Sequence, residues 1–154
     1  MYSLGSNSLH FRHRFIVKAP LEQVAEFHFN PQALSLLSPP LTFMSFNKIQ
    51  PLAEGSISDF KMWIGPFPIR WVAMHSNVDI KTGFTDEQLS GPFEKWVHQH
   101  TFHALDDNQT EIMDRIEASF SKGLFWGILS RLIWMGLPLL FFYRKRRTIE
   151  ILQR

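Results

Sequence analysis

The sequence predicts an α+β domain in which an antiparallel sheet of consecutive strands packs against a long C-terminal helix. Between residues 41 and 120, runs rich in Ile, Val, Phe, Trp and Thr alternate with short turn-forming segments, as in a meander of hairpins. Helix-starting prolines follow the first strand. The segment 124–143 is almost continuously apolar, which predicts the long helix.

The first strand and two short helices precede this meander. Apolar residues alternate with mostly polar ones over residues 9–18, and His13 takes a place on the apolar side of that strand. Pro20 suits the first turn of a helix, and apolar residues recur at helical spacing over residues 21–28. An Asn-Pro pair then begins a second helix over residues 33–37, which two further prolines end.

The remaining strands are separated by turn signals, and about seven strands result in all. These signals lie at 51–55, 65–66, Asn77, Gly83, 91–92 and 106–108.

The hairpin at residues 84–102 has an unusual inner face. Successive side chains of a strand point to opposite faces, so one surface carries Trp96, His98, His100 and Phe102. A close-packed core normally excludes imidazoles unless a partner satisfies them. Two histidines between Trp and Phe therefore predict a roomy, partly polar interior, which we interpret as a cavity.

With these features the chain resembles the START/Bet v 1-like (SRPBCC) helix-grip superfamily, in particular its small polyketide cyclase/dehydrase-like, ligand-binding members. The resemblance implies a curved antiparallel sheet around a long C-terminal helix, with a hydrophobic ligand pocket between them. It implies no particular ligand, because the superfamily spans carriers, receptors and cyclases. The segments that carry it are 19–24, 38–41, 84–102, 110–114 and the basic segment from Tyr143.

Two carboxylates are expected inside the predicted cavity. Asp86 shares a strand face with Phe84 and Gln88, and Asp114 lies among apolar neighbours on the next strand but one. An ionised carboxylate in such surroundings is costly unless it is paired. We therefore expect a His–Asp network that includes His98 or His100.

The purpose of this network stays open at the level of sequence. Its members can satisfy one another and fix the register of the sheet, or they can orient a ligand. His98 and His100 with one carboxylate also have the composition of a zinc or ferrous iron site, and a histidine beside a carboxylate can transfer protons. A register shift from a bulge at Gly91 would instead turn one or both histidines to solvent. We assign no catalytic residue and no metal ligand.

Candidate ligand-binding residues are those expected on the inner face, together with two further tryptophans. Aromatic residues at strand spacing usually pack in a core, which is the simpler interpretation of the tryptophans. The apolar loop 65–68 is expected at one end of the sheet, where it can border an entrance. The candidates are Trp63, Trp71, Phe84, Asp86, Gln88, Trp96, His98, His100, Phe102 and Asp114.

The apolar segment 124–143 also has to be tested against a membrane span. Its large apolar residues contribute about −3 to −7 kcal/mol to insertion, while Arg131 near the middle costs about +3 kcal/mol. Pro138 and two glycines further favour a broken helix. We favour the gripping helix of the domain, with interfacial attachment through the apolar and basic groups of 124–147 as an alternative.

Composition agrees with one domain, 1–154. The chain is 45% hydrophobic and 19% charged, it contains no cysteine, and its net charge is only +2. Disulfides and thiolate chemistry are therefore excluded, and the basic residues are too dispersed for a nucleic-acid surface. The segment 1–8 lacks the features of a secretory signal, so we expect a cytoplasmic protein.

The function expected from the sequence is binding of a hydrophobic or amphipathic small molecule, such as a lipid, quinone or polyketide-like compound, without a cofactor. Two alternatives remain. One is a cyclase/dehydratase-type enzyme that uses the cavity histidines and aspartates as acid and base. The other is a membrane- or protein-interaction module that uses residues 124–147.

Overall fold

The computed structural model describes residues 7–154. The prediction that residues 1–8 carry no secretory signal concerns a segment that lies almost wholly outside the described residues. In chain order the elements are β1 (Leu9–Val17), α1 (Leu21–Phe29), α2 (Ala33–Leu36), β2 (Thr42–Ile49), β3 (Ile57–Ile64), β4 (Phe67–Asp79), β5 (Gly83–Ser90), β6 (Phe93–Asp106), β7 (Gln109–Phe120) and α3 (Leu124–Leu152).

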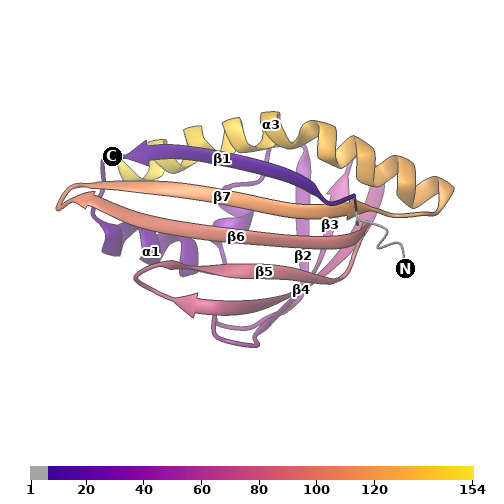
Figure 1. Cartoon of the computed structure of the whole chain (residues 1–154), viewed down its shortest axis with the longest axis horizontal. Helices are drawn as coiled ribbons and strands as arrows, with labels where there is room; N and C mark the ends of the chain where they lie inside the picture. Colours follow the sequence, from indigo (N-terminus) through magenta and orange to yellow (C-terminus); the bar gives the residue numbers. More distant parts are fainter. Residues whose placement is uncertain (1–6) are drawn as a thin grey trace, which may run out of the picture.

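The strands form one antiparallel sheet with the order β1-β7-β6-β5-β4-β3-β2. From β2 to β7 each strand pairs with the next strand in the chain, as a meander of hairpins requires. The last strand, β7, also pairs with the first, β1. The sheet curls so that β2 and β3 lie behind the long front strands, and α3 runs along it from the end of β7 to the C-terminus (Figure 1). The predicted α+β helix-grip architecture is confirmed.

The two short helices form where the sequence predicts them. Pro20 lies at the N-cap of α1, where its missing N–H costs nothing. Asn30 begins the turn before α2, and its side-chain Oδ1 accepts a hydrogen bond from the backbone N–H of Gln32 at 2.9 Å. Both helices lie behind the front strands and close one side of the curled sheet (Figure 1).

Helix α3 packs one narrow face against the sheet. Its buried residues recur at helical spacing, and among them Leu137 and Phe141 join one core cluster while Leu152 joins the other. By length and composition α3 could also cross a membrane, and only 22% of its most apolar window is buried. The helix therefore closes the core with one face and leaves a broad apolar face outside.

Candidate functional site

A cavity of about 230 Å³ lies between the concave face of the sheet, the α1–α2 region and α3. Its volume is far larger than the roughly 10–15 Å³ that a single water needs, so it can hold a small organic molecule. The wall is mostly apolar. Its aromatic and aliphatic members include Phe60, Trp71, Phe84, Trp96 and Leu137.

The cavity opens beside the α1–α2 connection. Three of the residues that line it, Asn30, Pro31 and Ile49, are exposed to solvent, and they lie after α1 and at the end of β2. The turn at Gly65 and Pro66, which the sequence suggests as a border of the entrance, contributes no lining residue.

A chain of hydrogen-bonded imidazoles and carboxylates crosses the polar side of the cavity. It runs across β3, β4, β5, β6 and β7, one strand to the next. The Nδ1 of His75 lies 2.5 Å from Asp86 Oδ1, and Nε2 of His100 lies 2.9 Å from Asp86 Oδ2. The Nδ1 of His100 lies 3.0 Å from Asp114 Oδ1, and Nε2 of His98 lies 2.9 Å from the same oxygen. Ser58 Oγ lies at one end of this hydrogen-bonded series, 2.9 Å from His75 Nε2.

Strand register holds these groups together. His75 stands opposite Asp86, and His100 stands opposite Asp114, in directly paired positions of neighbouring strands. The Phe84 ring stacks on His100 with centroids 4.3 Å apart. Gly83 has φ of +127°, and a side chain there would collide with the backbone carbonyl of His100, so a glycine is needed for the close approach of β5 and β6.

The two neighbouring histidines of β6 differ in charge. Burial opposes the charged form of His100, but hydrogen bonds to Asp114 and Asp86 outweigh it and raise its pKa to about 9. Burial and the adjacent His100 charge lower the pKa of His98 to about 4. The pKa values of Asp86 and Asp114 stay well below their usual range, because bonds from the histidines outweigh burial. At neutral pH, His100 is therefore an imidazolium between two carboxylates and His98 is neutral.

A second, smaller cavity of about 30 Å³ adjoins the first. Both cavities are lined by His28, His100, Phe141 and Arg144. The Nδ1 of His28 donates to the carbonyl of Val24 at 2.8 Å, and burial lowers the pKa of His28 to about 4. This imidazole is therefore also neutral.

Solved structures with the same architecture cover nearly the whole chain. A Chromobacterium violaceum protein aligns with a TM-score of 0.75 at 9% identity, over 95% of this chain and 99% of that one. An aromatase/cyclase from a Streptomyces species aligns at 0.68 and 13% identity, over 94% and 90%. Norcoclaurine synthase from Thalictrum flavum, in complex with dopamine and hydroxybenzaldehyde, aligns at 0.67 and 18% identity, over 93% and 87%.

The chain has the START/Bet v 1-like helix-grip fold. No protein-family model matches its sequence, and comparison with curated proteins finds no match.

Within this helix-grip fold, the candidate residues are placed in different surroundings. Those that line the main cavity are Trp71, Phe84, Asp86, Trp96, His98 and His100. Asp114 borders only the smaller cavity, where it anchors both β6 histidines. Phe102 shares their strand face but is buried in the core with Phe15 and Ile112.

Trp63 and Gln88 do not reach the cavity. Trp63 is 37% exposed on the outer face of β3, because Phe60 and Met62 on that strand occupy the inner parity. The side-chain amide of Gln88 donates a hydrogen bond to the carbonyl of Phe93 and accepts one from its backbone N–H. These two bonds stabilise the β5–β6 turn.

Sequence reasoning missed His75, Ser58 and Arg144. His75 has the same strand parity as Trp71 and Ala73, and this shared parity is the signal that could have found it. Arg144 follows Leu137 and Phe141 at helical spacing, although it belongs to a basic run.

A metal ion at this site would compete with the proton on His100. Asp86, His98 and His100 offer ligand atoms within 4.8 Å of one another. However, both ring nitrogens of His100 lie within 3.0 Å of carboxylate oxygens, and a metal ion would have to displace a proton from this imidazole. The described geometry is that of a proton-bearing network.

Proposed function

We propose that the chain, 1–154, is one START/Bet v 1-like domain that binds a hydrophobic or amphipathic small molecule, such as a lipid, quinone or polyketide-like compound. The cavity of about 230 Å³, apolar except along the His–Asp chain, is the observation that carries this proposal. Burial of apolar ligand surface supplies about 25 cal/mol per Å², and the polar strip orients the ligand's polar end. Norcoclaurine synthase, crystallised with small aromatic molecules, supports the proposal by its similar fold.

Filling the cavity should weaken binding. Leu137 is 1% exposed and lines the cavity, whereas Leu139 on the same helix is 75% exposed. We expect Leu137→Trp to weaken binding of the apolar fluorophore N-phenylnaphthylamine by at least about tenfold, which corresponds to about 1.4 kcal/mol. Leu139→Trp introduces the same side chain outside the cavity and should bind the probe like the parent.

Met44 on β2 also lines the cavity, so Met44→Trp provides an independent variant should Leu137→Trp fail to melt cooperatively. Unchanged probe affinity in folded Leu137→Trp and Met44→Trp would show that the probe binds elsewhere and would refute the proposal.

A cyclase/dehydratase activity is the second candidate, and one observation favours it. His98 is neutral, lines the cavity, and hydrogen-bonds within the described residues only through Nε2. Its Nδ1 lone pair is therefore available to accept a proton from a bound molecule. Binding remains our first proposal because most of the described residues that line the cavity are apolar, and binding an apolar molecule needs no reacting group.

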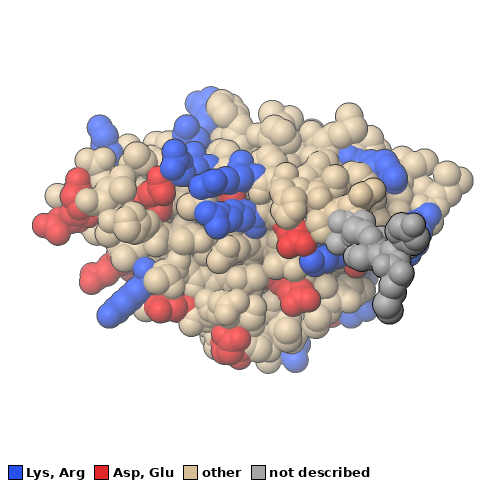
Figure 2. Space-filling view, viewed as in Figure 1, with Lys and Arg blue, Asp and Glu red and all other residues tan. Residues whose placement is uncertain are grey.

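The outer face of α3 supports a second property, peripheral attachment to an anionic membrane. Large apolar residues recur along it at helical spacing, and Arg131, Lys145, Arg146 and Arg147 lie on the same helix. In Figure 2 the surface over the N-terminal half of α3 is mostly uncharged, and the Lys and Arg that gather on the left lie largely over β1 and β7 of Figure 1. The exposed apolar residues are Leu124, Phe125, Trp126, Ile128, Leu132, Met135, Leu139 and Phe142.

This attachment predicts binding to vesicles that contain phosphatidylglycerol and much weaker binding to pure phosphatidylcholine, because anionic lipid adds about 1 kcal/mol for each nearby basic residue. The double variant Leu132→Asn/Leu139→Asn should lose co-sedimentation with the anionic vesicles. Leu89→Asn, at an exposed position on β5, is the control and should bind normally. Equal binding by both variants would exclude α3 as the contact surface.

A further inference from the structure

Arg144 presents a cationic group to both cavities. It lines both cavities, and its Nε is buried with no partner among the described residues. Its guanidinium lies over the Phe141 ring, 5.4 Å from the centroid, and this cation–π contact supplies no acceptor for the buried Nε–H. This arrangement contrasts with Arg147, whose Nη1 lies 2.7 Å from Glu150 on the helix surface.

The nearby carboxylates do not serve as hydrogen-bond acceptors for Arg144. Asp86 and Asp114 are the acidic groups that interact electrostatically with Arg144, but each is already bonded by two histidines. Neither is within ion-pair distance of the guanidinium among the described residues. Burial accordingly lowers the pKa of Arg144, with only partial compensation from the two carboxylates, and the group nevertheless stays charged at neutral pH.

A buried donor group without an acceptor is destabilising, and a ligand that supplies the acceptor recovers that free energy on binding. Guanidinium groups have donors only and match a carboxylate with two parallel hydrogen bonds. The guanidinium would repel a protonated amine, and an alcohol offers it only a single oxygen. The apolar wall formed by Leu137, Leu140 and Trp71 requires that the rest of the ligand be hydrophobic.

We propose that the cavity selects an apolar monocarboxylate, whose carboxylate pairs with Arg144 while its hydrocarbon body fills the space toward Trp71. This inference rests on the proposed ligand-binding function and specifies the chemical class of the ligand. The His–Asp chain then lies beside the bound carboxylate, but its imidazolium His100 is already paired with Asp86 and Asp114, so the positive charge that attracts the ligand comes from Arg144.

The test compares three ligands with one hydrocarbon chain and different polar ends: decanoate, decanol and decylamine. Their affinities are measured near neutral pH, below their aggregation limits, by displacement of N-phenylnaphthylamine from the chain of residues 1–154. We expect decanoate to bind at least about tenfold more tightly than decanol, and decylamine to bind most weakly. This comparison needs no variant, so it does not depend on the folding of one.

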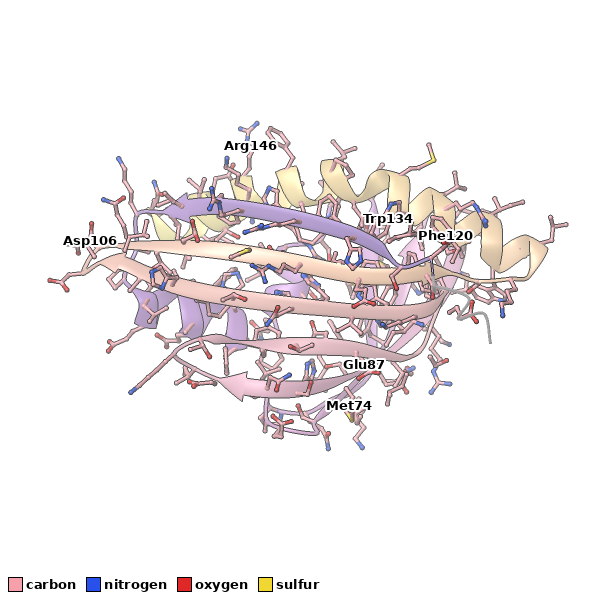
Figure 3. The ribbon with its side chains drawn as sticks, in the orientation of Figure 1. Met74, Glu87, Asp106, Phe120, Trp134 and Arg146 are labelled. Atoms are coloured by element: carbon pink, nitrogen blue, oxygen red, sulfur yellow. The ribbon has the colours of Figure 1, made fainter. Side chains whose placement is uncertain are left out.

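Two arginine variants on the same helix locate the effect. Arg144→Met should reduce decanoate affinity to that of decanol and leave decanol binding unchanged. Arg146→Met removes a charge from a side chain that projects outward from α3, as Figure 3 shows, and should change neither affinity.

Decanoate binding no tighter than decanol binding in the parent chain would overturn the inference, as would equal losses in Arg144→Met and Arg146→Met. Failure of all three ligands to displace the probe would instead contradict the proposed binding function itself.

Discussion

A chain that ends after Phe120 will not fold. Helix α3 supplies Leu137 and Phe141 to one core cluster and Leu152 to the other, so its removal exposes both clusters and the cavity to water. Each fully buried side chain of this kind stabilises the fold by about 1.5–3 kcal/mol. A small domain is stable by only about 5–15 kcal/mol, so losing this helix leaves no stable core. Circular dichroism of the truncated chain should show no cooperative thermal transition.

The matched control keeps the helix and alters its outer face. Leu132→Asn/Leu139→Asn changes two exposed residues, so it should retain a sharp melt close to that of the parent. A cooperative, native-like transition in the truncated chain would show that α3 is an anchor attached to a complete domain, and our assignment of its role would be wrong.

The fold could be predicted from sequence because several independent patterns agree on it. Strand alternation in the 84–102 hairpin, turn signals and helix-starting prolines all specify the observed order of elements. The orientation of α3 could not be predicted in the same way. Its apolar residues surround the helix, and only contact with the sheet distinguishes Leu137 from Leu139.

The prediction of cavity residues from sequence was limited by similar causes. Strand β3 carries large apolar side chains on both faces, so sequence could not exclude Trp63 from the cavity. His75 pairs with Asp86 across a strand interface that contains two register irregularities, which parity rules do not anticipate. Arg144 belongs to a basic run that resembles a solvated surface, and its approach to the cavity depends on how α3 docks.

By contrast, the pairing of Asp114 follows from local alternation alone. Its neighbours Ile112 and Ile116 are buried, so the carboxylate between them must enter the interior, and the histidines of the adjacent strand are within reach. The pairing of His75 with Asp86, by contrast, required the three-dimensional structure.

Asp114→Asn should destabilise the fold strongly at mildly acidic pH. Asp114 contacts both His98 and His100, and removing its charge leaves a buried imidazolium with one carboxylate instead of two. Breaking a buried ion pair from one side typically costs about 3–5 kcal/mol. The matched control is Asp59→Asn, which breaks a 2.8 Å pair with Arg70 at the surface and should cost much less, because solvent screens it. Urea unfolding of each variant measures the difference.

The pH dependence of this loss separates electrostatics from packing. The pKa of Asp114 is lowered in the fold, so its contribution is present above the ordinary value of 3.8 and is lost as the pH falls further. The pKa of His100 is raised from 6.5 to about 9, so its contribution is complete below 6.5 and is lost as the pH rises through about 9. The free-energy difference between parent and Asp114→Asn should therefore be largest between pH 3.8 and 6.5, and should shrink below pH 3.8 and as the pH rises through about 9. A difference that stays constant from below pH 3.8 to above pH 9 would show that Asp114 stabilises the sheet by shape alone.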